Sequence, residues 1–451
     1  MTGGGRGRNL APRVTFADPL GVGLSRTSME DVLKLRASAI LMGLLLCSPA
    51  VVRAEEEAAV SATDSATVSS PDVQGLIDGL NEQLQTLQAD TDKLKRFKFS
   101  GYVQARMDVS EASNDSVKVS GSPATITPAN QSRFYIRRAR VRLTYDSSPL
   151  SQASVLFDGG QDRTIRLLEA YVTLLDPWTA NHDHQLTVGQ FSVPFGYEVE
   201  RSSSVRELPE RSRAETVLFS GERDRGVKLE SQWTLNLKTT LAVLNGGGIN
   251  SVDFPTTDPT RAKDVTARAR WSQGPWDAAV SWYRGRQVTA LTGPDVLTDK
   301  NRLGFDAQVF YALPLLGGGT LRGEYYSGHD VNADSLSALV TSPSSANPVR
   351  LLKANAQGQH LATDIRGGYV MAVQNLGERF QAVVRYDQYD PNTALAHDAY
   401  RRWSFGVNAF VYGYTRLTIA YDAIHTDKLV SANRYTDPHD NLWTVQLQHK
   451  F

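Results

Sequence analysis

From residue 99 to the C-terminus the chain is a succession of short runs in which apolar and polar residues alternate. In one of them Val265, Ala267 and Ala269 alternate with charged or hydroxyl residues. Because neighbouring side chains of a strand point to opposite faces, each run predicts a strand with one apolar and one polar face. Most runs have 8 to 11 residues, close to the length of a tilted strand that crosses a bilayer. Sixteen such runs lie at 99–109, 133–145, 151–158, 165–175, 184–192, 224–232, 235–244, 264–272, 276–284, 302–312, 319–327, 363–372, 379–387, 401–411, 415–422 and 441–451.

The connections between these runs alternate between long polar segments and tight turns such as SSPL and SQGP. The connection at 159–164 is the exception: it is short, although the alternation predicts a long connection at this position. Long loops at one end and tight turns at the other are typical of outer-membrane barrels. We therefore predict an all-β protein, with a sixteen-stranded antiparallel transmembrane β-barrel over residues 97–451 and a short α-helical coiled coil before it.

Residues 1–54 are predicted to be an N-terminal extension and a secretory signal peptide. Two basic residues precede an apolar run of about a dozen residues, and a small-residue cleavage site ends at Ala54. The start of translation is expected at either Met1 or Met29. Cys47, the single cysteine, lies inside this run, so the mature chain is expected to contain no disulfide.

Two further segments separate the signal peptide from the barrel. Residues 55–70 are acidic, small and polar, which predicts a disordered linker. Residues 71–96 carry apolar residues at alternating spacings of four and three, which favours a coiled-coil helix. The alternative is one amphipathic helix that packs on its own domain.

The last run, NLWTVQLQHKF, carries a strong local signal. Trp443, Val445 and Leu447 share one parity with the terminal Phe451, while polar residues occupy most of the other. A chain that ends in an aromatic residue on such a strand resembles the assembly signal of bacterial outer-membrane proteins. The alternative is a soluble edge strand that happens to end in phenylalanine.

The second run, RFYIRRARVRLTY, gives the barrel wall an orientation. Arg138, Arg140 and Arg142 share one parity, and the residues between them are apolar. An arginine on the lipid face in mid-membrane costs about 2–4 kcal/mol, so these three are predicted to face the lumen. Arg133 and Arg137 are expected near the outer rim, where their side chains extend to lipid headgroups.

Composition excludes several classes of function. The chain has 48 basic and 48 acidic residues, whereas a nucleic-acid-binding protein usually shows a net basic domain or patch. No phosphate-cradling glycine loop, metal-ligand cluster or nucleophile with a base is visible. We therefore expect no enzyme activity, no cofactor or metal, and no nucleic-acid partner.

Several motifs resemble the phosphate-selective porin O and P family. They are GYVQARMD (101–108), RRARVRL (137–143), LLEAYV (167–172), GQFSVPFGYE (189–198) and ERDRGVKLE (222–230). The resemblance covers roughly residues 97 to 451 and implies a homotrimeric outer-membrane porin that conducts small anions such as phosphate. Its partners would be outer-membrane lipids and small inorganic or organic anions, and the coiled coil would lie on the periplasmic side.

By the same resemblance, the connection at about 193–223 folds into the lumen and narrows it. Guanidinium groups there would replace part of an anion's hydration shell. The predicted pore-lining or anion-binding residues are Arg138, Arg140, Arg142, Arg268, Arg270, Arg201, Arg206, Arg211, Arg213, Arg223 and Arg225. The alternative for the loop is a self-neutralised network of salt bridges that braces the barrel.

Acidic residues also fall on the predicted lumen face, among them Asp264, Asp306 and Glu324. A weakly selective general porin is therefore an alternative to an anion channel. A second alternative is an outer-membrane tether whose coiled coil binds cell-wall polymer.

Overall fold

The computed structural model describes residues 70–111, 113, 132–160, 164–249, 260–289, 296–330, 362–394, 399–426, 428–431, 434–437 and 440–451. The predicted signal peptide and all but the last residue of the predicted linker lie outside these ranges. The chain forms two compact units, up to Thr91 and from Asp92 onward, which are described separately. Among the described residues, no helix is long and apolar enough to cross a membrane.

Helix α2 (Ser70–Lys95) occupies the segment with the heptad pattern. Leu80, Leu84 and Leu87 lie on this pattern, and each is more than half exposed. Lys93 and Lys95 occupy the last turn, where positive charge complements the negative end of the helix dipole. The structure thus contains the helix, while the coiled coil stays a prediction.

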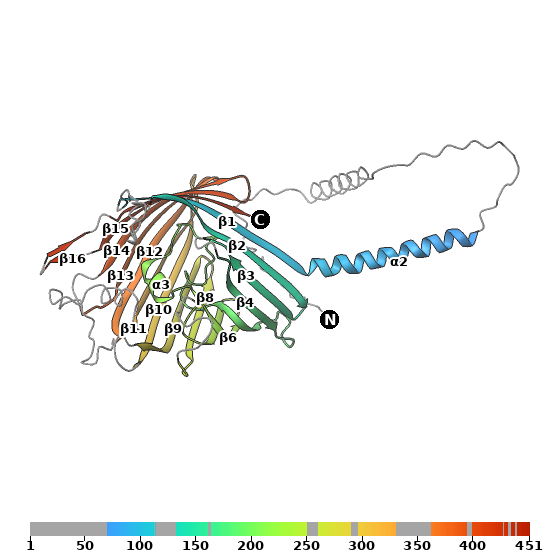
Figure 1. The fold of residues 1–451 in the computed structure, drawn as a ribbon, viewed down its shortest axis with the longest axis horizontal. Helices are drawn as coiled ribbons and strands as arrows, with labels where there is room; N and C mark the ends of the chain where they lie inside the picture. Colours follow the sequence, from blue (N-terminus) through green and yellow to red (C-terminus); the bar gives the residue numbers. More distant parts are fainter. Residues whose placement is uncertain are drawn as a thin grey trace, which may run out of the picture. The chain divides into compact units, whose positions relative to one another are not determined.

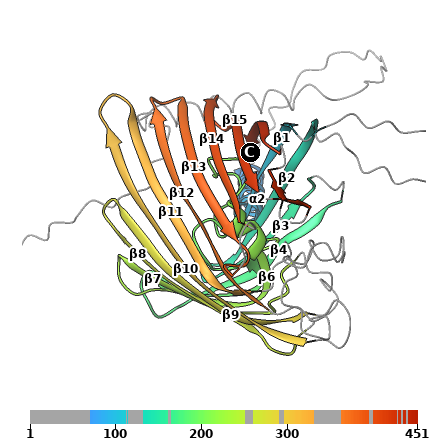
Figure 2. The ribbon, with the colours of Figure 1, turned by 90° about the vertical axis from the view of Figure 1, so that its left-hand side faces the viewer.

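Sixteen strands close into an antiparallel barrel, which confirms the predicted architecture (Figure 1). Figure 2 shows the neighbouring strands of one wall side by side, each paired with the next along the chain. The barrel strands are β1 (Phe97–Ser110), β2 (Arg133–Ser148), β3 (Ser151–Asp158), β4 (Arg166–Leu175), β5 (His184–Ser192), β6 (Arg223–Gln232), β7 (Leu237–Leu244), β8 (Asp264–Gln273), β9 (Trp276–Thr289), β10 (Val296–Leu313), β11 (Gly317–Asp330), β12 (Thr363–Leu376), β13 (Phe380–Asp390), β14 (Tyr400–Val411), β15 (Thr415–Thr426) and β18 (Leu442–Lys450). Strands β16 (Lys428–Ser431) and β17 (Arg434–Thr436) form a separate hairpin.

The barrel closes where β18 pairs with β1. Beyond the last strand residue, the backbone N–H of Gly101 donates to the carbonyl of Phe451 at 2.9 Å, and the N–H of Phe451 donates back at 3.0 Å. The Phe451 ring stacks on Phe99, with 5.6 Å between centroids. A Cβ at Gly101 would lie 2.5 Å from both this ring and the carbonyl oxygen of Arg140, so the seam requires glycine there.

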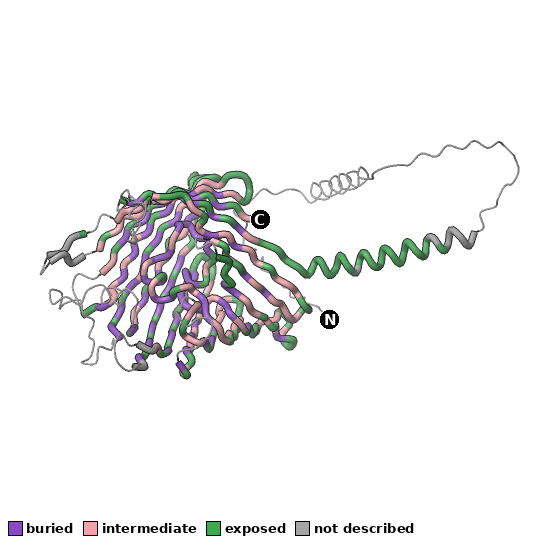
Figure 3. The backbone as a smooth tube through the Cα atoms, viewed as in Figure 1, coloured by how far each residue is buried: buried purple, intermediate pink, exposed green. Residues whose placement is uncertain are grey.

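Buried and exposed residues alternate along the barrel strands (Figure 3). Many of the buried residues are polar, and many of the exposed ones are large and apolar. On β18, Gln446 and Gln448 are each 2% exposed, whereas Val445 and Leu447 are 40% and 49% exposed. This is the reverse of a soluble core, and it matches a wall with lipid outside and polar groups in the lumen. The parity predicted for the final strand is therefore present in the structure.

One prediction about β2 is wrong, and a β-bulge explains why. Gln104 pairs with Arg138 but the next residue, Ala105, pairs with Ile136, so Arg137 is the extra residue of β2. A bulge bends the strand and re-aims the side chain at the extra position. Arg137 consequently turns to the inside of the barrel and does not extend to the membrane surface.

The outward face can be tested at Val384, near the middle of β13 and 38% exposed. We expect Val384→Arg to lower the free energy of unfolding by about 2–4 kcal/mol, since a mid-membrane arginine on the lipid face is costly. Urea unfolding in phospholipid vesicles measures this change. Val384→Ala is the control, and equal losses for both variants would contradict a lipid-facing position.

Candidate functional site

The connection between β5 and β6, residues 193–222, lies inside the barrel and is called the lumen loop below. The hydroxyl of Tyr102 on β1 bonds Ser203 of the loop at 2.5 Å, and the Gln104 side chain donates to the Ser203 carbonyl at 3.2 Å. On another part of the wall, Asn408 of β14 donates to the carbonyl of Glu207 at 2.9 Å. Helix α3 (Arg213–Leu218) forms part of this loop (Figure 1). The loop is therefore bonded to more than one strand of the inner wall.

One end of the lumen loop is held by Glu324 of β11. Its carboxylate accepts the backbone N–H groups of Tyr197 and Glu198, each at 2.8 Å. The hydroxyl of Tyr326 also donates to it, at 2.5 Å. Gly196 adopts a positive φ of 63°, and a Cβ there would lie 2.5 Å from the Glu324 carboxylate. The glycine in the sequence PFGYE is thus required by a left-handed turn and a close approach to the wall.

Two buried arginines of neighbouring strands satisfy carbonyl groups of the loop. Arg385 of β13 donates to the carbonyl of Glu210 at 3.0 Å and to that of Arg211 at 3.3 Å. Arg402 of β14 donates to the same Arg211 carbonyl at 2.6 Å and to Asp387 at 2.8 Å. Because buried backbone carbonyls need hydrogen-bond donors, these arginines allow an irregular loop to lie within the lumen.

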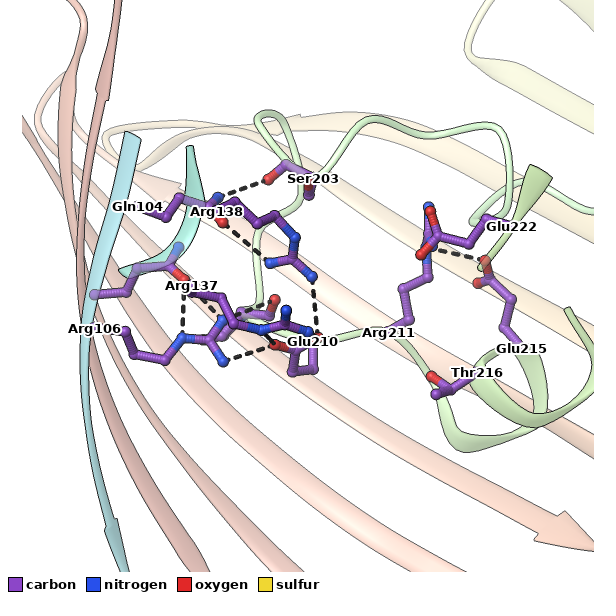
Figure 4. Close-up of polar contacts among 12 residues, drawn as sticks. Gln104, Arg106, Arg137, Arg138, Ser203, Glu210, Arg211, Glu215, Thr216 and Glu222 are labelled. Atoms are coloured by element: carbon purple, nitrogen blue, oxygen red, sulfur yellow. Dashed lines mark hydrogen bonds and ion pairs between the residues drawn. The ribbon is translucent and has the colours of Figure 1, made fainter. Parts of the chain in front are cut away.

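On the β1–β2 wall a single carboxylate, Glu210, binds three arginines (Figure 4). Its distances are 2.7 Å to Arg106, 2.8 Å to Arg137 and 3.3 Å to Arg138. Burial acts to raise the pKa of Glu210, but the three guanidinium groups hold that pKa well below its usual range. We call these four residues the Glu210 clamp. Arg106 was not predicted, although its parity with Gln104 in GYVQARMD could have indicated an inward position.

The other predicted arginines near this wall also contact acids. Arg140 donates to Asp158 at 2.8 Å. Arg142 and Arg223 share Glu169, at 2.6 and 3.0 Å. These side chains therefore line the inner wall as ion pairs.

Arg268 and Arg270 of β8 show the same arrangement farther round the barrel. Arg268 makes hydrogen bonds of 2.5 and 2.9 Å to Asp306, which is a two-point contact. Arg270 likewise contacts both oxygens of Asp277. Two-point guanidinium–carboxylate pairs are geometrically specific. Arg270 thus joins β8 to the adjacent β9, and Arg268 joins β8 to β10, two strands away.

Two of the predicted loop arginines are bound within the loop. Arg201 donates to Glu207 at 2.7 Å and lies 5.1 Å from the ring centre of Tyr197. Arg211 donates to the carbonyls of Glu198 and Val199, at 3.0 and 3.1 Å.

The remaining predicted arginines differ from one another. Arg213 lies 5.3 Å from the ring centre of Tyr400, and Arg225 is half-buried on β6. Arg206 is buried without an ion pair to any described residue. The anion-binding role of the whole set stays a prediction.

Within the described ranges, no group of three or more His, Cys, Asp and Glu side chains is placed to hold a metal ion.

Two of the cavities that border the lumen loop share three arginines in their linings. The larger, about 950 Å³, reaches Tyr414 and Lys450 near the short turns. The smaller, about 270 Å³, reaches the β3–β4 connection on the side of the long loops. Arg140, Arg211 and Arg223 line both cavities, so these three arginines mark the boundary between the two sides of the loop.

In both cavities the basic side chains outnumber the acidic ones. Each has seven basic and three acidic side chains in its lining. The acids are Glu169, Glu200 and Glu230 in the larger cavity and Asp158, Glu210 and Glu222 in the smaller one. Burial raises the pKa of Glu200 above its ordinary value. A cavity with an excess of positive charge attracts ions of the opposite sign.

Known structures share the barrel fold. The outer-membrane channel DcaP of Acinetobacter baumannii superimposes with a TM-score of 0.53 at 13% identity, over 79% of this chain and 97% of that one. An anion-selective porin from Comamonas acidovorans gives 0.52 at 13% identity, over 79% and 99%. The trimer form of OmpT, an outer-membrane protein of Vibrio cholerae, gives 0.53 at 10% identity, over 79% and 99%. No family model and no curated protein matches the sequence. The chain thus has the porin barrel fold, while the resemblance to the phosphate-selective family stays a prediction.

The Glu210 clamp can be tested with Glu210→Gln, which removes the charge shared by the three arginines. Losing one partner of a buried ion pair costs about 3–5 kcal/mol, and Glu210 is partly exposed, so we expect a loss of about 3 kcal/mol in urea unfolding. The loosened loop is expected to make single-channel currents noisier in planar bilayers. Glu200→Gln is the matched control, since its carboxylate approaches Arg268 only to 4.0 Å. Equal effects of the two variants would argue against the clamp.

A second test uses the fully buried Glu215, which lies 3.0 Å from Arg211 (Figure 4). Burial holds the pKa of Glu215 well above its ordinary value of 4.5, whereas the pKa of Glu198 is lowered to about 2, against burial, by Arg385. The native state therefore keeps a proton on Glu215 that the unfolded chain releases above its ordinary pKa. Stability consequently falls as pH rises from 4.5 towards the raised pKa.

We expect the melting temperature of the wild type to fall as the pH rises above 4.5, the ordinary pKa of the group, towards the raised pKa of Glu215. Glu215→Gln, which is neutral throughout, is expected to flatten this part of the profile. A circular-dichroism melt at each pH provides the measurement, with Glu222→Gln as a control within the same loop. An unchanged slope in Glu215→Gln would show that this proton is not retained.

Proposed function

We propose that this protein is an outer-membrane porin, a passive diffusion channel for small anions, and not an enzyme. The observation that carries the proposal is the pair of cationic cavities that meet at Arg140, Arg211 and Arg223. An anion that crosses the barrel passes these three guanidinium groups. The similarity in fold to a porin described as anion-selective supports the same choice.

Ion pairing in the wall suits passage as well as stability. Arg140 and Arg223 each keep a carboxylate partner, Asp158 and Glu169 respectively. A guanidinium that already has a partner offers an anion a favourable but weak contact. Conduction needs binding that is strong enough for entry and weak enough for release, and a partly neutralised row of arginines meets both needs.

Phosphate is one of the anions that we propose, on the resemblance to the phosphate-selective family. The contact pattern also supports a broader preference, because acids accompany the arginines throughout the lumen. A weakly selective general porin is the alternative outcome of the selectivity test.

We further propose a homotrimer with the coiled coil on the periplasmic side of the outer membrane. The exposed apolar stripe of α2, including Leu80, Leu84 and Leu87, supports a helical partner, and a second copy supplies an identical stripe. The apolar outer wall supports membrane lipids as partners of the barrel. The alternative is a tether that binds cell-wall polymer, and its barrel would give no steady current steps in a planar bilayer.

Selectivity is tested by the reversal potential in a potassium chloride gradient. Wild type is expected to show anion preference, and Arg142→Gln combined with Lys228→Gln is expected to reduce it, because both charges line the larger cavity. Arg286→Gln is the matched control, since Arg286 is exposed and pairs with Asp299 outside both cavities. A wild-type reversal potential near zero would overturn the anion channel, and equal shifts in both variants would overturn the assigned pathway.

A further inference from the structure

Among the arginines of the lumen loop, Arg206 stands apart in its contacts. It is 4% exposed, and its Nε and Nη1 atoms find no hydrogen-bond partner among the residues that the structure describes. Arg201 and Arg211, by contrast, each bond a carboxylate or several carbonyls. A buried charge without a partner is costly, so the position of Arg206 needs an explanation beyond bracing the loop.

The nearby acids are already engaged by other groups. Glu210 is held by three arginines in the clamp, and Glu198 lies 3.3 Å from Arg385. Glu215 lies 3.0 Å from Arg211. Burial and the neighbouring charge of Arg211 lower the pKa of Arg206 to about 9, so it remains a cation at neutral pH. Arg206 therefore has carboxylates nearby but forms no ion pair with any described residue.

Arg206 lines the smaller cavity, on the side of the long loops. Arg138, Arg140 and Arg211 contribute to the same lining. Its volume of about 270 Å³ equals that of several waters, at about 30 Å³ each in the liquid. A small oxyanion with part of its hydration shell fits this space.

We propose that Arg206 is the core of an oxyanion-binding site in the smaller cavity, just before the boundary arginines. This inference rests on the proposed anion channel and deepens it by naming the residue and the ligand class. The planar guanidinium fork matches two oxygens of a sulfate, phosphate or carboxylate group, and it has no such match with chloride. The site holds an entering oxyanion briefly, while the paired arginines around it form the wall.

The test is block of the chloride current by sulfate in planar bilayers containing the full-length protein. Wild type is expected to show a saturable reduction of the potassium chloride conductance as sulfate is added. Arg206→Gln is expected to raise the half-blocking sulfate concentration about tenfold, the loss of one hydrogen-bonded charge contact. Arg206→Lys retains the charge without the fork and is expected to fall between the two.

Arg416→Gln is the matched control. Arg416 is also a buried arginine inside the barrel, but it lines neither cavity, so its removal is expected to leave the half-blocking concentration unchanged. Absence of saturable block in wild type, or equal shifts in Arg206→Gln and Arg416→Gln, would overturn the site. The absence of saturable block is measured on wild type alone, so the proposal stays testable even if Arg206→Gln fails to fold.

The reversal potential in potassium chloride separates this inference from the proposed function. Anion preference without sulfate block leaves the channel in place and rejects the site. If wild type shows no anion preference, the proposed anion channel is rejected. The sulfate measurements still decide whether Arg206 binds an oxyanion.

Discussion

The position of the lumen loop depends on one carboxylate that three arginines share. Glu210 reaches across to the β1–β2 wall and binds Arg106, Arg137 and Arg138 there. Glu324 holds the same loop on β11. A loop fixed at these separated points crosses the lumen, and the cavities remain on its two sides. The location of the passage is thus a consequence of where the loop is anchored.

A charged lumen creates a stability problem that this barrel solves by pairing. Guanidinium groups that face a low-dielectric wall are costly unless carboxylates or carbonyls lie within hydrogen-bond distance. Most of the arginines discussed above have such partners, contributed by neighbouring strands or by the loop. The prediction of cationic walls and the alternative of a salt-bridge network therefore describe the same side chains. The proposed binding residue, Arg206, differs from them because its Nε and Nη1 have no hydrogen-bond partner among the described residues.

The strands were predictable because each depends on a local pattern. Period-two alternation and run length located all sixteen barrel strands, and the longest difference is at β10, which begins at Val296 where the run began at 302. The inward parity of Arg138 and Arg140 was predictable for the same reason. Arg137 was not, because its bulge exists only in the register between β1 and β2. Likewise, Arg385 and Glu198 are 187 residues apart, and no local pattern reports such a pair.

The sequence by itself determined the barrel, the face that each strand turns to lipid and the polar character of the lumen. These follow from the alternation of apolar and polar residues, since a strand has only two faces and only an apolar face can lie against the lipid. The tertiary structure alone decided which arginines are paired, which three border both cavities, and that Arg206, buried beside the smaller cavity, has no ion pair with any described residue. Ion pairing depends on distances of a few ångströms between residues far apart in the chain, and only the closed barrel with its docked loop sets those distances.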